Sequence, residues 1–106
     1  MKVVYNWLKE FVEVKASPED LRARLSLVGI AVDSIDETVA GPVLDAEITA
    51  NRPDCLGHLG IAREVAAIYR VPLKPLHPNL KEITEKAAGS TRVEIEAPEL
   101  CGRFTA

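Results

Sequence analysis

Three chemically active side chains stand close together in the stretch TANRPDCLGHLG: Asp54, Cys55 and His58. The Cys-x-x-His spacing can supply two zinc ligands, and the neighbouring carboxylate can supply a third. The same thiol and imidazole could instead act as a nucleophile and its base, provided that nearby positive charge lowers the pKa of the thiol. A third interpretation is that the stretch is a structural turn.

The rest of the sequence offers little support for either chemical interpretation. Structural zinc usually takes two separated pairs of ligands, whereas the other candidates, His77 and Cys101, lie in the polar second half of the chain. A nucleophile at Cys55 would have Arg52 and the start of a helix beside it, but the sequence implies no substrate pocket. We therefore favour the structural interpretation.

That interpretation gives each residue of the NRPDC run a local role. The side chains of Asn51 and Asp54 satisfy backbone N–H groups in turns and caps. Pro53 fixes its own φ and keeps Arg52 extended, so that a preceding strand ends there. Cys55 behaves as a small apolar residue. The sequence thus predicts a structural corner at these five positions, with no catalytic, cofactor-binding or metal-binding residue.

A strand and a helix are predicted on either side of this corner. Apolar and polar side chains alternate over 44–48, as in a strand with one exposed face. Apolar residues recur at helical spacing over 59–70, and the proline at position 72 ends that helix. Gly57 and Gly60 would allow the backbone to approach closely at its first turn.

The first residues predict a short strand followed by a short helix. Residues 2–5 are rich in β-prone side chains, and Asn6 can cap a helix that follows them. Trp7, Leu8, Phe11 and Val12 would share the apolar face of this helix. We expect Trp7 to be an anchor of the core.

A second helix is predicted over 18–28. Ser17 is a suitable N-cap, Pro18 suits the first helical position, and Gly29 can adopt the left-handed conformation that stops a helix.

A hairpin should follow this helix. The alternation over 30–35 slips by one residue near Ser34, which predicts a bulge, and residues 40–42 break the chain before the strand at 44–48. Five acidic residues should lie on the exposed side of this hairpin: Asp33, Asp36, Glu37, Asp45 and Glu47.

Composition restricts the functional class. The chain has 106 residues, enough for one small domain and a tail, and its net charge of −3 includes no basic run that would neutralise a phosphate backbone. Few aromatic residues are present to stack on bases. No apolar segment has the length of a membrane span. We expect a cytoplasmic protein with reduced thiols, no membrane contact and weak or no nucleic-acid binding of its own.

The second half of the chain reads as an extended tail. Prolines at 72, 75 and 78 favour an extended connector, and residues 81–91 are polar with one weak turn of helix. The alternation in RVEIE predicts a strand over 92–96 that has no partner nearby. We therefore predict an N-terminal helix and hairpin domain over 1–76, a linker over 77–91, and the first strand of a following, truncated domain over 92–106.

Several runs of the sequence resemble one known family. The runs MKVVYNWLKEFVEV, SPEDLRARLSLVGIAVDSI and, above all, EITANRPDCLGHLGIAREVAAIYRVPLKPL are similar to the N-terminal domain of the bacterial phenylalanyl-tRNA synthetase beta subunit. The tail RVEIEAPELCGRFTA resembles the opening of that subunit's next domain. The resemblance covers most of 1–76 and again 92–106.

The resemblance implies an α+β fold: a small three-helix module with a short antiparallel sheet and a winged-helix-like architecture. It further implies a non-catalytic structural segment of a heterotetramer of two alpha and two beta subunits. That assembly uses ATP and magnesium to attach phenylalanine to its tRNA, and the family's catalytic residues lie outside this segment. The expected partners are therefore the alpha subunit and the remainder of the beta subunit, with tRNA as a partner of the whole enzyme.

One feature departs from the family pattern. Most bacterial members carry an oligonucleotide-binding-fold domain, an auxiliary tRNA-binding unit, between the strand after the second helix and the strand before NRPDC. Here only residues 38–43, TVAGPV, join those strands, so we do not expect this chain to have that role. The alternative function is a free-standing winged-helix-like interaction module that would contact nucleic acid through Arg52, Arg63 and Arg70 or would bind a protein.

Overall fold

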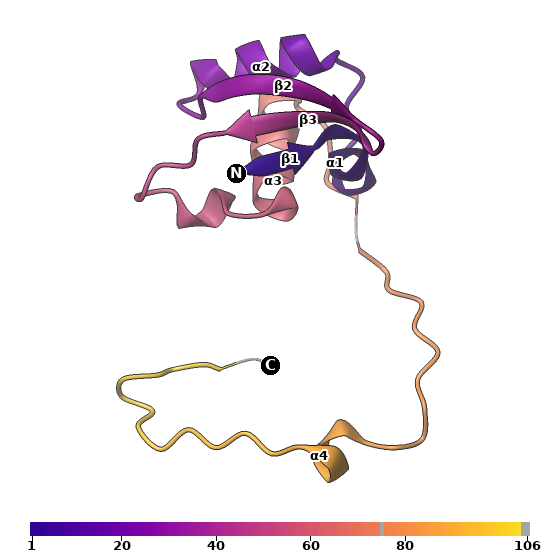
Figure 1. Cartoon of the computed structure of the whole chain (residues 1–106), viewed down its shortest axis with the longest axis vertical. Helices are drawn as coiled ribbons and strands as arrows, with labels where there is room; N and C mark the ends of the chain where they lie inside the picture. Colours follow the sequence, from indigo (N-terminus) through magenta and orange to yellow (C-terminus); the bar gives the residue numbers. More distant parts are fainter. Residues whose placement is uncertain (75, 105–106) are drawn as a thin grey trace.

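A three-stranded antiparallel sheet forms one layer of the molecule (Figure 1). The computed structural model describes residues 1–74 and 76–104. The strands are β1 (Lys2–Val4), β2 (Val32–Thr38) and β3 (Gly41–Ala46), and β3 lies in the middle, in the order β1-β3-β2. The predicted α+β class is confirmed.

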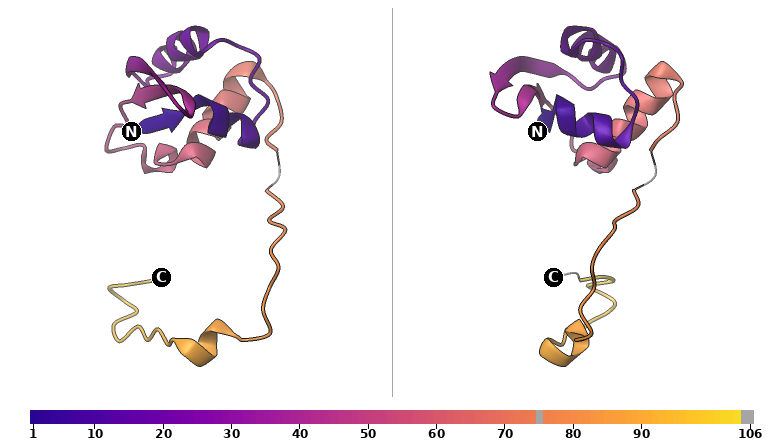
Figure 2. Two further views of the ribbon diagram at one scale, coloured as in Figure 1. Left: turned by 45° about the vertical axis from the view of Figure 1, so that its right-hand side comes forward. Right: turned by 90° about the vertical axis from the view of Figure 1, so that its right-hand side faces the viewer.

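Three helices form the second layer, behind the sheet in the view of Figure 1 and beside it in Figure 2. They are α1 (Tyr5–Phe11), α2 (Pro18–Leu27) and α3 (His58–Tyr69). Their apolar faces and the inner face of the sheet enclose one core, because each element alone would leave an apolar face in water. Its largest fully buried side chains include Leu8, Leu21, Leu25, Ile30, Leu44 and Ile61.

The start of α1 differs from the prediction. Val4, not Asn6, is the N-cap, and it makes no side-chain cap. Asn6 instead lies in the first turn of α1, where its amide donates to the carbonyl of Ala40 in the β2–β3 hairpin at 2.9 Å. The prediction failed because a side chain that can cap a helix can equally well bind a distant backbone group.

The predicted core position of Trp7 is also wrong, since 49% of this residue is exposed. Because the helix begins at Tyr5, the residues at i, i+3 and i+6 of α1 are buried: Tyr5, Leu8 and Phe11. Trp7 lies outside this buried face. Its ring lies 6.0 Å from that of Phe11 and 4.0 Å from that of His58.

The predicted start of α2 is confirmed, and the helix ends at Leu27, one residue before the predicted end. Ser17 accepts a hydrogen bond from the backbone N–H of Asp20 at 3.2 Å, and Pro18 occupies the first helical position. Gly29, just beyond the helix, has a φ of 88°.

The hairpin is confirmed, with shifted boundaries. The register between β2 and β3 slips between Val32 and Ile35, which is the predicted bulge. β2 continues to Thr38 and β3 begins at Gly41, because strand pairing extends to the tight turn at Val39 and Ala40. At its other end, β3 stops at Ala46. The acidic residues lie on exposed positions except Asp45, which is half-buried beside Lys2, with 2.9 Å between Nζ and Oδ2.

After α3 the chain passes the end of α1 before it leaves the folded part. Arg70 ends α3 in the left-handed conformation, with φ 53°. Leu73 forms an isolated bridge with Val12, and the backbone N–H of Lys74 donates to the carbonyl of Phe11 at 2.7 Å.

The remaining described residues, 76–104, extend away from the core and are exposed except for Ala97 (Figure 1). They contain the predicted weak helical turn, α4 (Ala87–Ser90). The strand predicted over 92–96 is not formed, because no other strand lies beside it to share a ladder. No helix among the described residues combines the length and the apolar run that crossing a bilayer requires.

Candidate functional site

The NRPDC run folds as a tight corner between β3 and α3. The backbone N–H of Arg52 donates to Thr49 at 2.9 Å, and that of Cys55 donates to Arg52 at 3.0 Å. Residues Pro53–Cys55 form a single turn of 3-10 helix, called η1. The hydroxyl of Thr49 donates to the Asn51 side-chain oxygen at 2.6 Å. All five predicted corner residues therefore lie together in this turn. Their predicted roles are partly wrong: the side chains of Asn51 and Asp54 bind the side chains of Thr49 and Arg52 in place of backbone N–H groups, and Arg52 is not extended, with φ −120° and ψ 51°.

Arg52 is the centre of the polar contacts at the corner. Its Nε and Nη2 atoms donate to the two carboxylate oxygens of Asp54 at 3.0 and 2.9 Å. Nη2 also lies 2.7 Å from Oε1 of Glu64 on α3 and 3.0 Å from Sγ of Cys55. One guanidinium thus joins the turn to the helix, and such bidentate, charge-assisted contacts are the stronger kind of hydrogen bond.

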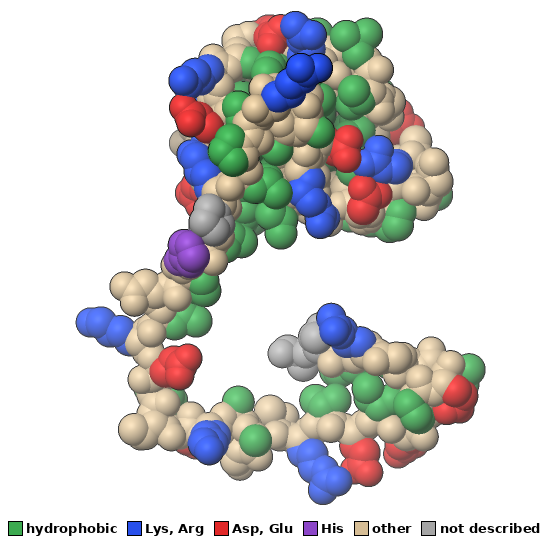
Figure 3. Space-filling view, turned by 180° about the vertical axis from the view of Figure 1, so that it is seen from behind, with side chains coloured by type: hydrophobic (Ala, Val, Ile, Leu, Met, Phe, Trp, Pro, Cys, Tyr) green, Lys and Arg blue, Asp and Glu red, His purple; other side chains and the backbone are tan. Residues whose placement is uncertain are grey.

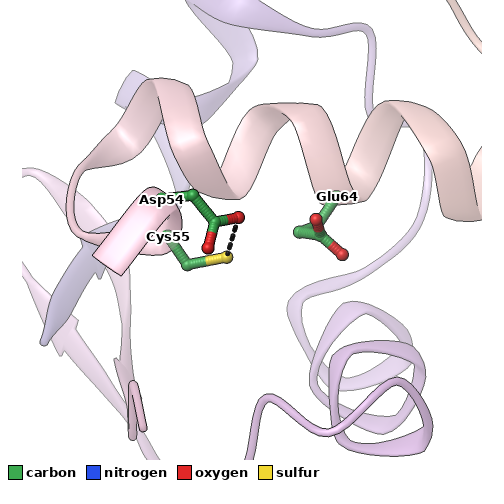
Figure 4. A group of neighbouring side chains, drawn as sticks. All are labelled: Asp54, Cys55 and Glu64. Atoms are coloured by element: carbon green, nitrogen blue, oxygen red, sulfur yellow. Dashed lines mark hydrogen bonds between the residues drawn. The ribbon is translucent and has the colours of Figure 1, made fainter. Parts of the chain in front are cut away.

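Asp54, Cys55 and Glu64 are neighbours, and one ligand atom of each lies within 4.8 Å of those of the other two (Figure 4). These atom types can bind a metal ion. However, the Arg52 guanidinium contacts all three groups and already supplies the positive charge that they need. A bound cation would have to displace it. The cluster is best explained as an internal ion-pair network.

The electrostatics of the corner also disfavour a nucleophile. Hydrogen bonding to Arg52 lowers the pKa of Asp54 to about 2. Burial, with the neighbouring Asp54 carboxylate, raises the pKa of the fully buried Cys55 thiol. A catalytic cysteine needs the opposite shift. Cys55 is therefore a protonated packing residue at neutral pH.

His58 binds other groups than the cluster, which separates the residues considered as metal ligands or as a nucleophile pair. Its Nε2 accepts a hydrogen bond from the backbone N–H of Val4 at 2.9 Å, and its ring packs against Trp7. An Nε2 that accepts carries no proton, so the neutral ring holds its proton on Nδ1. Burial lowers the pKa of His58. His58 thus closes the outer edge of β1 and is not the base of a Cys55–His58 pair.

Gly60 gives the corner its close packing. A Cβ atom at Gly60 would lie 2.1 Å from the carbonyl oxygen of Asp54, so only glycine fits where α3 crosses η1. At Gly57, for which close approach was also predicted, an added Cβ would meet no atom within 4 Å; its φ of 127° is what requires glycine there.

Two contacts of the site were not predicted from the sequence. Glu64 is the network's link to α3, yet it lies 12 positions from Arg52. Val4 is bound by His58 across 54 positions. For the contact of Arg52 with Glu64, the only signal in the sequence is a carboxylate on the predicted helix that follows the arginine. For the contact of His58 with Val4, the sequence contains no signal.

Two arginines of the alternative nucleic-acid hypothesis already bind groups of the corner. Arg52 is held in the ion-pair network, and Arg63 donates to the carbonyl of Asp54 at 3.3 Å. Figure 3 shows Lys and Arg side chains interspersed with Asp and Glu on the face opposite to that of Figure 1. Phosphate binding favours clustered positive charge, so this geometry does not support the hypothesis.

Known proteins similar to this chain share one name. The phenylalanine–tRNA ligase beta subunit of Rhodopirellula baltica is 42% identical over 107 residues, a match that covers 100% of this chain and 16% of that protein. The beta subunits of Anaeromyxobacter dehalogenans and Moorella thermoacetica are 43% and 39% identical, covering 74% and 85% of this chain and 9% and 12% of their own lengths. The chain is homologous to a part of phenylalanine–tRNA ligase beta subunits.

No family model matches this chain, and no solved structure matches it. The chain spans less than a fifth of the length of these beta subunits. The match to the Rhodopirellula baltica beta subunit is only one position longer than the 106-residue chain, so the aligned region includes no inserted domain. The two-residue turn between β2 and β3 agrees with this.

Proposed function

We propose that the chain is a non-catalytic structural segment of a phenylalanine–tRNA ligase beta subunit. The observation that carries this proposal is the 42% identity over the whole chain with a beta subunit of that name. The site geometry supports the non-catalytic part, because the reactive side chains of the corner bind each other. Arg52 holds Asp54 and Glu64, Cys55 is fully buried, and His58 binds the backbone of β1.

The complete enzyme would supply the chemistry. We infer an ATP- and magnesium-dependent ligase that attaches phenylalanine to its tRNA in the cytoplasm. Its partners would be an alpha subunit and the remaining part of the beta subunit, in an assembly of two of each. ATP, magnesium and the tRNA would bind outside this segment. The proposed N-terminal domain, residues 1–76, would then act as a packing unit joined by a linker, 77–91, to a following domain that begins within 92–106.

A replacement experiment tests the proposal. The matched region of the Rhodopirellula baltica beta subunit is exchanged for this chain, and the chimera is co-expressed with the alpha subunit of the same organism. We expect the chimera to co-purify with the alpha subunit and to form phenylalanyl-tRNA, and the 106-residue chain alone to form none. Failure of the chimera to bind the alpha subunit, or synthesis by the chain alone, would contradict the proposal.

The free-standing interaction module is the less well supported alternative. Its nucleic-acid form needs Arg52, which the ion-pair network holds, and a surface of clustered positive charge, which Figure 3 does not show on that face. Titration of tRNA with the chain at low salt tests it, since phosphate contacts would produce binding that weakens steeply as salt is added.

A further inference from the structure

Trp7 heads an exposed apolar surface where α1 meets the start of α3. We call it the Trp7 surface and define it by Trp7, by His58, whose ring it contacts, and by the exposed leucines on either side of His58 in the chain, Leu56 and Leu59. Trp7 is 49% exposed, and Leu56 and Leu59, which flank His58 in the chain, are 66% and 43% exposed. Tryptophan is enriched among the residues that dominate protein interfaces.

Contacts within this chain hold the Trp7 ring in place. It lies against the ring of His58, 4.0 Å between centroids, and His58 is itself held by the backbone of Val4. Phe11 supports it on the other side at 6.0 Å. A side chain that is already immobile loses little entropy on binding, which favours an interface anchor. No acceptor for the Trp7 indole N–H lies among the described residues, so a partner that covers the ring must supply one.

The chain leaves the folded part at the end of the helix that carries Trp7. Leu73 pairs with Val12 at the end of α1, and Lys74 donates from its backbone to Phe11 and from Nζ to the carbonyl of Lys9. The chain therefore leaves the folded part at the end of α1, and any segment beyond the exposed residues 76–104 stays tethered to that point. In the Rhodopirellula baltica beta subunit, 16% of the protein corresponds to this chain, so most of the polypeptide lies outside the matched part.

We propose that the Trp7 surface is where the rest of the beta subunit packs on this segment. This inference rests on the proposed function and names its contact surface. The occupant is a segment of the same, longer polypeptide that presents aliphatic side chains around Trp7 and a carbonyl or carboxylate oxygen to its indole N–H. The half-exposed ring becomes buried in the complete subunit.

Hydroxyl-radical labelling, read residue by residue with mass spectrometry, tests this directly. The 106-residue chain is compared with the full-length chimera bound to its alpha subunit. We expect Trp7 to be labelled readily in the chain alone and, in the chimera, as slowly as the fully buried Leu8. Leu27, which is 80% exposed on α2, is the internal control and should be labelled equally in both proteins.

Two variants of the chimera separate the surface from general folding. Trp7→Ser should restore labelling of Leu59, and the matched change Leu27→Ser should not. Equal labelling of Trp7 in the chain and in an active chimera would overturn the inference and leave the proposed function standing. A chimera that does not assemble would overturn both. Protection of Trp7 in the chain alone, lost on dilution, would identify a second copy as the occupant and also overturn the inference.

Discussion

Gly60 sets the distance between α3 and the η1 turn, and a methyl group there should destabilise the protein. The added Cβ would lie 2.1 Å from a backbone oxygen, which cannot move away as a flexible side chain could. We expect Gly60→Ala to lower the free energy of unfolding by about 2 kcal/mol or more, the cost of overpacking a close contact. Urea denaturation followed by circular dichroism measures it.

The matched control for Gly60 is Gly89 in α4. A Cβ at Gly89 meets nothing within 4 Å, so Gly89→Ala should change the free energy of unfolding by less than about 0.5 kcal/mol. If the two substitutions had equal effects, α3 and η1 would have to lie farther apart at Gly60 than they do in the structure.

His58 should make the stability depend on pH. Only the neutral ring can accept the N–H of Val4, and burial lowers the pKa of His58 below its ordinary 6.5. The unfolded chain therefore binds the proton more readily. The contribution of His58 is complete above pH 6.5 and is lost as the pH falls toward the lower pKa of the folded state.

The measurement is urea denaturation at about pH 7.5 and about pH 5, on either side of the ordinary histidine pKa. The wild-type chain should lose more stability between the two than His58→Gln, which does not titrate. An identical loss in both would mean that His58 does not carry the pH dependence.

Among single residues, the sequence predicted several local roles correctly and the distant partners poorly. The roles of Ser17, Gly29 and the bulge near Ser34 follow from neighbours within four positions, and the structure confirms them. The contacts of Asn6 with Ala40 and of His58 with Val4 span the fold. They depend on which elements meet, and spacing along the chain does not contain that information.

Among the helices, α3 ends in an unfavourable backbone conformation. Arg70 adopts the left-handed conformation, with φ 53°, which glycine adopts freely and other residues at a cost of about 1 kcal/mol. We expect Arg70→Gly to raise the free energy of unfolding by about 1 kcal/mol. Thermal and urea denaturation check this.

The control substitution for Arg70 lies one turn earlier in α3. Ala67 is exposed within the helix, so Ala67→Gly should lower the free energy of unfolding by about 1 kcal/mol. The two glycine substitutions must therefore have opposite signs. A destabilising Arg70→Gly would mean that α3 continues beyond Tyr69 in solution.

The three helices and the hairpin were predicted as elements because each has a clear apolar period and stop signals. Their boundaries moved by up to three residues where pairing extended a strand, as in β3. The buried face of α1 was predicted correctly at Leu8 and Phe11 and wrongly at Trp7, which is half-exposed. In a two-turn helix, two faces fit the apolar pattern equally well.

At the scale of the whole molecule, stability should reside in the first part of the chain. Every described residue from 76 to 104 except Ala97 is exposed, and the core is built from residues that precede them. A chain ending at residue 76 should therefore melt within about 2 °C of the 106-residue chain, since a loss of 1 kcal/mol would shift the melting temperature by more. A larger decrease would place part of the core in the tail and contradict the proposed domain boundary.

The central claim is that the reactive residues of the NRPDC corner act through packing and the chemistry lies elsewhere. The most direct test is the aminoacylation rate constant of the chimera carrying Cys55→Ala, measured at a temperature where circular dichroism shows it folded. The account predicts a rate within about threefold of the unsubstituted chimera, because a packing change leaves the transition-state contacts in place. A loss of about 10²-fold or more in the folded chimera, the size expected when a catalytic group is removed, would contradict it.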